Sequence, residues 1–87
     1  MEKSDKVILS WLEERKQPLR SSDIKTLFRK EKFTEKMTGL LSATKTSVTL
    51  HMKTIDGAQK TIEYFNGKQI DRIGKLKVFN FLNSSMK

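Results

Sequence analysis

The chain has 87 residues, of which 32% are charged, and its 18 Lys and Arg against 10 Asp and Glu give a net charge of +8. This length allows one domain with a compact core. The absence of cysteine excludes disulfides, thiolate metal sites and thiol nucleophiles. No segment approaches the roughly 20 apolar residues of a membrane span, and the N-terminus does not resemble a secretory signal, so no membrane partner is expected.

The excess of positive charge makes a polyanion the first partner to consider, because Lys and Arg that neutralise phosphates release condensed counterions. Residues 1–43 carry ten basic and seven acidic side chains, whereas residues 44–87 carry eight and three. Unopposed positive charge is therefore more concentrated in the second half. The alternative is that a small domain is basic simply to remain soluble.

A first helix is predicted from Ser4 or Asp5 to about Gln17, where Pro18 stops it. Its apolar residues form one stripe at helical spacing, in which Trp11 is a core anchor. This stripe consists of Val7, Ile8, Trp11 and Leu12.

A second helix is predicted to begin at Ser21 or Ser22, with Asp23 in its first turn. It would bury Ile24, Leu27 and Phe28. A third, short helix is predicted for residues 34–44, in which Thr34 is the N-cap and Gly39 is a weak point. It would bury Met37, Leu40 and Leu41.

The stretch LSATKTSVTLHMKTIDG, residues 41–57, fits two periodicities. With 3.6 residues per turn it is a helix that places Val48, Met52 and Ile55 on one side. With a period of two it is a strand that places Val48, Leu50 and Met52 on one side. Thr and Val are poor helix formers and favour the strand.

The residues after Gly57 are rich in β-branched and aromatic side chains. Asn66-Gly67 is typical of a two-residue hairpin turn, so a hairpin is predicted over residues 60–80. A final strand would follow Gly74, built from Leu76, Val78, Phe79 and Phe81.

The segment TEKMTGLLSATKTSVTLHMKTI, residues 34–55, resembles the helix-turn-helix of winged DNA-binding domains in MarR/ArsR-like transcriptional regulators. Met37 and Leu41 match the apolar positions of the first helix, and Ser42-Ala43-Thr44 match its turn. The chain departs from the pattern at Ser42, where the family usually has Gly, and at Leu50, where it usually has a polar residue.

This resemblance implies an α+β fold, a single winged helix-turn-helix domain over residues 1–87. Three to four N-terminal helices would precede a β-hairpin wing and a final strand, and residues 1–4 and 83–87 would be frayed. It implies sequence-specific binding of double-stranded DNA by a small transcriptional or replication regulator. Helix 44–56 would enter the major groove and hairpin 60–80 would lie on the backbone. The predicted DNA contacts are Lys45, Thr46, Ser47, Thr49, Lys53, Asn66, Lys68, Arg72 and Lys75.

If residues 46–55 form a strand, they would pair with residues 60–65 across Asp56-Gly57, and helix 34–44 would face the DNA. The contact set would then be Lys36, Thr38, Ser42 and Lys45.

Two other functions remain open. One is single-stranded nucleic-acid binding, in which Tyr64, Phe65, Phe79 or Phe81 would stack bases beside lysines on a basic aromatic sheet. The other is a winged-helix protein-interaction module.

No enzyme is expected, because the chain has no Gly-rich phosphate loop, no Cys or His pair and no grouped carboxylates. The lone His51 makes a metal site an unfavourable interpretation. No cofactor or small-molecule ligand is expected. Dimerisation would imply two-fold related half-sites, but no dimer interface is evident. The expected location is cytoplasmic or nucleoid-associated, or nuclear in a eukaryote.

Overall fold

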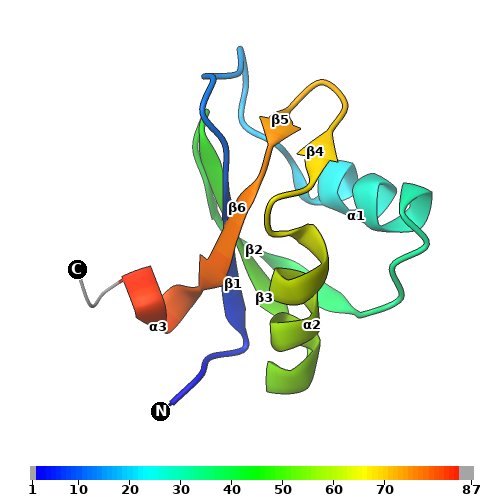
Figure 1. Cartoon of the computed structure of the whole chain (residues 1–87), viewed down its shortest axis with the longest axis vertical. Helices are drawn as coiled ribbons and strands as arrows, with labels where there is room; N and C mark the ends of the chain where they lie inside the picture. Colours follow the sequence, from blue (N-terminus) through cyan, green and yellow to red (C-terminus); the bar gives the residue numbers. More distant parts are fainter. Residues whose placement is uncertain (1, 85–87) are drawn as a thin grey trace.

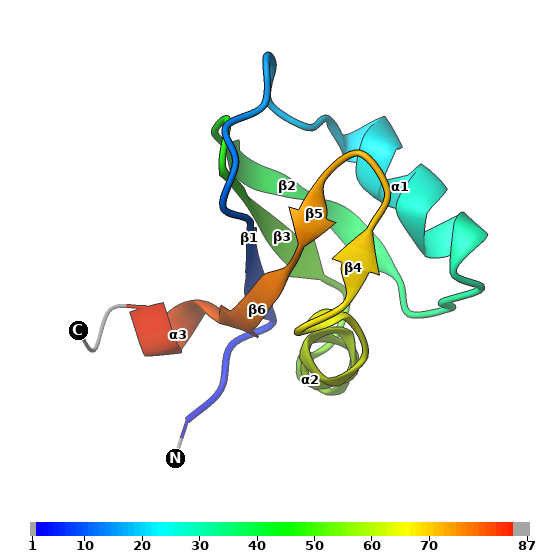
Figure 2. The ribbon, with the colours of Figure 1, turned by 45° about the horizontal axis from the view of Figure 1, so that its top comes forward.

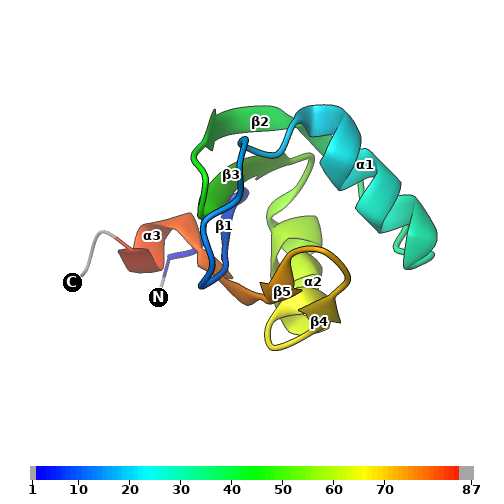
Figure 3. The same ribbon diagram turned by 90° about the horizontal axis from the view of Figure 1, so that it is seen from above.

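The computed structural model describes residues 2–84, which form a four-stranded antiparallel sheet flanked by helices (Figure 1). In chain order the elements are β1 (Lys6–Ser10), α1 (Ser21–Lys30), β2 (Met37–Ala43), β3 (Ser47–Met52), α2 (Ile55–Phe65), β4 (Gln69–Ile70), β5 (Gly74–Lys75), β6 (Lys77–Asn80) and α3 (Phe81–Ser84). The strand order in the main sheet is β2-β3-β1-β6, and β4 and β5 form a separate small hairpin. Helices α1 and α2 lie on one side of the sheet and α3 on the other (Figures 2 and 3).

The hydrophobic core lies between the sheet and the two longer helices. Alternate residues of β1 and β3 point into it, with Val7, Val48, Leu50 and Met52 fully buried and Leu9 nearly so. The helices contribute their own buried faces, which are Ile24, Leu27 and Phe28 of α1 and Ala58, Thr61 and Phe65 of α2. One face of each strand is therefore committed to the core, and the opposite face of the sheet is left without α1 or α2.

The predicted first helix is wrong, because its residues form strand β1 and a loop. The apolar residues that decide the structure are Val7, Leu9 and Trp11, which are at most 6% exposed and alternate with a period of two. Leu12, which completed the helical stripe, is 94% exposed. Trp11 is a core residue as predicted, and its indole Nε1–H donates to the Lys45 carbonyl at 3.0 Å.

The predicted second helix is confirmed as α1, with its expected apolar residues buried. Its N-cap is Arg20 rather than a serine. The Arg20 backbone N–H donates to Oδ2 of Asp23 at 2.7 Å. Asp23 thus satisfies one exposed backbone donor and places a negative charge at the positive end of the helix.

The predicted third helix is also wrong, because residues 37–43 form the edge strand β2. The β2–β3 register shifts between Met37 and Gly39 and again between Leu40 and Ser42. Each shift inserts an extra residue into β2, and these bulges obscure the period of two in the sequence. Met37 and Leu40 nevertheless pack against the core.

The predicted helix over residues 44–56 is wrong, because residues 47–52 form the central strand β3. β3 pairs with β1 on one side and β2 on the other, so its strand periodicity is reinforced by two backbone ladders. A helix would have buried Ile55, which is 53% exposed in the structure. The alternative strand interpretation identified the element correctly but assigned it the wrong partner, residues 60–65.

The predicted hairpin over residues 60–80 is wrong in its first half, where residues 55–65 form helix α2. Ala58, Thr61 and Phe65 are buried on one helical face. Asn66 ends the helix, and Gly67 has a φ of 84°, a conformation that glycine adopts without strain. The Asn66-Gly67 pair therefore marks a helix end instead of a hairpin turn.

The predicted final strand corresponds to β6, which is shorter than expected because Phe81 begins α3. Of the termini predicted to fray, Ser4 is held by a hydrogen bond from its backbone N–H to Oδ1 of Asn80 at 3.1 Å. Residues 83 and 84 belong to α3. Residues 1 and 85–87 lie outside the described part of the chain.

Removing the N-cap of α2 is expected to lower the free energy of unfolding by about 1 kcal/mol. The Gly57 backbone N–H donates to Oγ1 of Thr54 at 2.8 Å, and Thr54→Ala would leave that donor without its partner. Urea denaturation of Thr54→Ala measures the loss, with Thr54→Ser as the control that keeps the acceptor. Equal stability of Thr54→Ala and wild type would show that the cap is not stabilising.

Candidate interaction surface

The face of the sheet opposite α1 and α2 is formed by the outward-pointing residues of four strands. Alternation and register place three residues of β1 on it, Lys6, Ile8 and Ser10, and three of β3, Ser47, Thr49 and His51. Residues of the outer strands that pair with these six lie on the same face. They are Lys77 and Phe79 of β6 and Gly39 and Ser42 of β2. We call these ten residues the open face.

The middle of the open face is a cross-strand row with an apolar and a hydroxyl half. Phe79 pairs with Ile8, Ile8 with Thr49, and Thr49 with Ser42. Phe79 and Ile8 are half-buried, and the Ser42 hydroxyl donates to Oγ1 of Thr49 at 3.1 Å. The row therefore offers one aromatic ring, one aliphatic side chain and the exposed Ser42 side chain to a ligand, whereas Thr49 is only 8% exposed.

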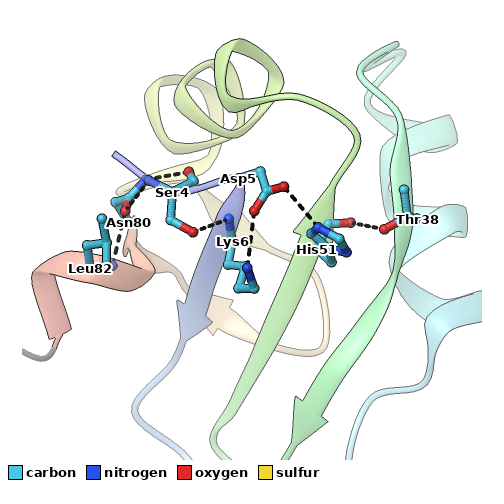
Figure 4. A network of polar contacts seen from close by, with 7 residues as sticks. All are labelled: Ser4, Asp5, Lys6, Thr38, His51, Asn80 and Leu82. Carbon is cyan, nitrogen blue, oxygen red and sulfur yellow. Dashed lines mark hydrogen bonds and ion pairs between the residues drawn. The ribbon is translucent and has the colours of Figure 1, made fainter. Parts of the chain in front are cut away.

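One end of the open face is held by a network of polar contacts (Figure 4). Nε2 of His51 lies 3.0 Å from Oδ2 of Asp5, and Nζ of Lys6 lies 3.3 Å from Oδ1 of the same carboxylate. The Thr38 hydroxyl donates to the His51 carbonyl at 3.0 Å. These contacts fix the His51 ring and partly neutralise Lys6, so this end has less free positive charge than its residue types suggest.

The network continues on the other side of Asp5 and ties the N-terminus to the end of β6 (Figure 4). The Asn80 side chain is 4% exposed; its Nδ2 donates to the Ser4 carbonyl at 2.9 Å, and its Oδ1 accepts from the Leu82 backbone at 3.0 Å. The network thereby fixes where α3 begins beside the open face.

The hydrogen bond with His51 lowers the pKa of Asp5 below the ordinary value of 3.8, and Lys6 lowers it further against the opposing effect of desolvation. Because the folded-state pKa is depressed, the stabilisation is complete above pH 3.8 and is lost as the pH falls through the folded-state pKa. A carbon-detected NMR titration of the Asp5 carboxyl is expected to give a midpoint below 3.8, and His51→Ala should raise it. A wild-type midpoint at or above 3.8 would contradict the hydrogen bond.

Most of the aromatic residues predicted for a base-stacking sheet lie elsewhere. Phe65 is fully buried in α2, and its ring stacks on Phe28 with centroids 5.4 Å apart. Tyr64, also in α2, packs against Phe33, and its hydroxyl donates to Oε1 of Glu31 at 3.0 Å. Only Phe79 belongs to the open face, and Phe81 begins α3 beside it.

Five of the nine predicted contact residues lie on or near β3, although not on a helix. Ser47 and Thr49 point from the open face, and Thr49 is only 8% exposed. Lys45 and Thr46 lie in the turn between β2 and β3, and Lys53 follows β3. The structure therefore spreads these five along one strand, with Lys45 and Lys53 beyond its opposite ends.

The other four predicted contact residues, Asn66, Lys68, Arg72 and Lys75, lie around the β4–β5 hairpin. Oδ1 of Asn66 accepts from the Val78 backbone at 2.9 Å. Nζ of Lys68 lies 3.6 Å from Oε1 of Glu31. Asn66 and Lys68 are thus occupied by internal contacts.

Arg15 connects this hairpin to the β2–β3 turn through its side chain and its backbone. Nη1 of Arg15 donates to the Arg72 carbonyl at 2.9 Å, and the Arg15 backbone N–H donates to the Lys45 carbonyl at 2.9 Å. These contacts hold together the loop after β1, the β2–β3 turn and the β4–β5 hairpin, which lie at the top of Figure 1.

Three residues of the open face were hidden in the sequence because residues 5–17 fit the pattern of a helix. Lys6, Ile8 and Ser10 were not considered as surface contacts, and Lys77 was not singled out. The signal that identifies the residues of β1 is the alternation of buried Val7, Leu9 and Trp11. It places Ile8 and Ser10, and Lys6 before them, on the opposite face of the strand.

Within residues 2–84, no group of three or more His, Cys, Asp or Glu is arranged to hold a metal ion. In the same part of the chain, no helix combines the length and the apolar composition needed to cross a bilayer.

No family model matches the sequence, and no curated protein is similar enough to it to count as a match. Several solved structures do share the fold. A structure described as a complex of two RRM domains has a TM-score of 0.69 and 19% identity, over 92% of this chain and 88% of that chain. The PID-3–TOFU-6 RRM domain complex has a TM-score of 0.70 and 18% identity, over 94% and 97%. A further complex of two RRM domains has a TM-score of 0.67 and 19% identity, over 88% and 86%.

These similarities overturn the predicted winged helix-turn-helix fold, its place among MarR/ArsR-like regulators and the sequence-specific double-stranded DNA binding derived from it. The segment that resembled a recognition helix is the central strand of the sheet, so it presents no helix to a major groove. In its place, the element order and the antiparallel β2-β3-β1-β6 sheet give this chain the β-α-β-β-α-β fold of an RNA recognition motif, or RRM, domain.

Proposed function

We propose that the chain is a protein-binding domain that uses the RRM fold without its base-stacking surface. In RRM domains that bind RNA, aromatic side chains on the sheet stack two or three bases. The outward positions of the two central strands here are Lys6, Ile8, Ser10, Ser47, Thr49 and His51. None of these six is Phe, Tyr or Trp, and this observation carries the proposal.

The single outward histidine does not replace the missing aromatic residues. His51 is held by Asp5 at 3.0 Å at one end of the open face. The same carboxylate also pairs with Nζ of Lys6 at 3.3 Å, so the His51 ring belongs to a cluster of charged side chains. The one suitable ring on the open face is Phe79, which lies on the edge strand β6 and leaves the centre of the sheet aliphatic and hydroxylated.

The three similar structures support a protein partner, because two are described as complexes of two RRM domains and the third as the PID-3–TOFU-6 RRM domain complex. The exposed apolar side chains of this chain also suit a protein interface. Leu41 and Ile55 are more than half exposed, and Tyr64 and Phe81 are about two-fifths exposed. Apolar and aromatic side chains of this kind anchor protein–protein contacts.

The proposal is tested by using the purified chain as bait in an extract of the cells that produce it, with and without ribonuclease. We expect at least one captured protein to survive the nuclease and, once purified, to bind the purified chain directly in a calorimetric titration. Loss of every captured protein on nuclease treatment would contradict the proposal, because the chain would then reach its neighbours through RNA.

Binding of single-stranded nucleic acid is a second candidate function, favoured by the net charge of +8. Phe79 lies beside Ile8 on the open face, and Lys77 is exposed on the same strand. One aromatic ring with nearby lysines fits weak contact with one base and the backbone. This candidate requires the affinity for RNA to depend on the Phe79 ring, whereas the proposed function does not.

Two expectations from the sequence stay predictions. We propose that the chain has no enzymatic activity of its own, in keeping with a binding domain. Its location, whether cytoplasmic, nucleoid-associated or nuclear, also stays a prediction.

A further inference from the structure

The edge strand β2 has only one of the features that normally protect a sheet edge from pairing. Its seven residues, MTGLLSA, contain no Lys, Arg, Asp, Glu or Pro, although 32% of the whole chain is charged. Edge strands are usually protected by charge, proline, shortness or bulges. β2 has bulges only, and among residues 2–84 no other strand pairs with its outer edge.

A groove of about 480 Å³ lies at the N-terminal end of β2, between that strand and the C-terminal half of α1. Its apolar lining comes from Phe28, Phe33 and Met37. Phe28 and Phe33 are in edge-to-face contact, with centroids 5.0 Å apart. This rigid aromatic base can receive an apolar side chain from a segment lying along β2.

A second groove, of about 650 Å³, lies between the other end of β2 and the N-terminal end of α1. Its apolar lining includes Pro18, Leu19, Leu40 and Ala43. Met37 lines the first groove, and Gly39, Leu40 and Ala43 line the second, so the two grooves follow β2 from its beginning to its end. The exposed Leu41 lies on the same strand. An extended segment that follows β2 would therefore meet apolar surface along most of its length.

Four cations surround the first groove, namely Lys25, Arg29, Lys32 and Lys36. All four are exposed, and among residues 2–84 none has a carboxylate oxygen within the 4.0 Å of an ion pair. The one acidic residue lining the groove, Glu35, has its Oε2 3.7 Å from Nζ of Lys60. The groove is thus positively charged at its rim and apolar at its base.

The geometry points to β2 and its two flanking grooves as the docking site for an extended acidic segment of a partner protein. The segment would add a strand to the free edge, with alternate apolar side chains in the grooves and acidic side chains on the cations of α1 and Lys36. This inference rests on the proposed protein-binding function and names the chemistry of the partner.

Charge argues against a second copy of this chain as the occupant. Antiparallel pairing of two β2 strands would bring Lys36 of one copy towards Lys45 of the other at both ends of the contact. The two molecules would also each carry a net charge of +8. The same cations would attract the carboxylates of an acidic segment, and this attraction would speed association at low salt.

The probe for the test is a displayed library of random 12-residue peptides, selected against the full chain. We expect the selected peptides to have a net negative charge, with apolar residues at alternate positions. In amide NMR spectra they should shift the signals of residues 37–43 most strongly, and their affinity should fall as salt is raised. Peptides that are uncharged or basic, or that shift the signals around Ile8 and Phe79 instead, would overturn the inference.

Two kinds of variant separate docking from unfolding. Leu41→Lys places a charge on the edge and is expected to weaken the selected peptides on the order of tenfold. Its matched control is Leu12→Lys, the same change at a residue that is 94% exposed in the loop after β1. The charge-reversal variant Arg29→Glu/Lys36→Glu should have a similar effect, whereas Lys16→Glu/Lys75→Glu, with the same change in net charge, should not.

The remaining outcomes assign the edge to other occupants. Dimerisation of the chain that Leu41→Lys abolishes would assign the edge to a second copy and overturn the inference. Displacement of the peptide by a 12-nucleotide single-stranded RNA, dependent on Arg29 and Lys36, would assign the groove to nucleic acid. If no acidic peptide binds but a nuclease-resistant protein partner does, the inference fails and the proposed function stands. If neither binds, both fail.

Discussion

Replacing Phe65 by alanine is expected to lower the free energy of unfolding by about 3–5 kcal/mol. The Phe65 side chain is fully buried. Its ring stacks on Phe28 with centroids 5.4 Å apart and meets Phe33 edge-to-face at 5.0 Å. Truncation would remove these contacts and leave a cavity between α1 and α2. This loss is a large fraction of the roughly 5–15 kcal/mol by which a domain is stabilised.

Urea denaturation followed by circular dichroism measures this loss. Leu12→Ala is the matched control, since its side chain is 94% exposed and its truncation should change stability by less than about 0.5 kcal/mol. If Phe65→Ala cost less than about 1 kcal/mol, well below a core truncation, Phe65 could not lie at the centre of the core.

Placing two aromatic residues on the open face is expected to create affinity for single-stranded RNA. Ile8 and Thr49 are cross-strand neighbours in the middle of the sheet, next to Phe79. In Ile8→Phe/Thr49→Phe, three rings would lie in one row, and each stacked base contributes about 1–3 kcal/mol. Aromatic residues also favour strands, so the fold should tolerate the change.

Fluorescence anisotropy with a 12-nucleotide RNA of random sequence measures this gain at moderate salt. The matched control is Leu12→Phe/Ile55→Phe, which adds two rings at exposed aliphatic positions away from the open face. An equal affinity of the open-face variant and the wild type would mean that missing aromatic residues are not what limits RNA binding. The proposed function would then lose its main support.

Helix α1 was predictable from the sequence because its signals are local. Ile24, Leu27 and Phe28 follow the helical period, and Asp23 satisfies a backbone donor in the first turn. The final strand was partly predictable from a local signal as well, because apolar residues follow Gly74. One of them, Val78, is buried in β6.

The central segment was not predictable, because the deciding interactions are distant in sequence. Residues 47–52 fit a helix or a strand equally well by apolar spacing, and the strand is selected by pairing with both β1 and β2. Bulges at Thr38 and Leu41 disguise the alternation of β2 itself. The resemblance of residues 34–55 to a helix-turn-helix then favoured a helix over residues 44–56, although Thr and Val are poor helix formers.

The candidate sites show the same division between local and tertiary information. The positive charge of the chain was evident from its composition, but the cations around the α1–β2 groove come together only once residues 25–36 fold against β2. The open face could not be recognised while Ile8 was assigned to an apolar helical stripe. Its lack of aromatic residues becomes informative only after the sheet is known.

If the chain has the RRM fold without base stacking, its affinity for RNA should not depend on the Phe79 ring. The Phe79→Leu variant tests this most directly. Leucine keeps an apolar side chain beside Ile8. It removes the ring of Phe79, which is the only Phe, Tyr or Trp on the open face. We predict that affinity for a random 12-nucleotide single-stranded RNA falls steeply with salt and changes by less than about twofold in this variant, because phosphate contacts alone contribute. A loss of about 10-fold or more, the equivalent of one stacked base, would contradict the claim and assign the open face to RNA.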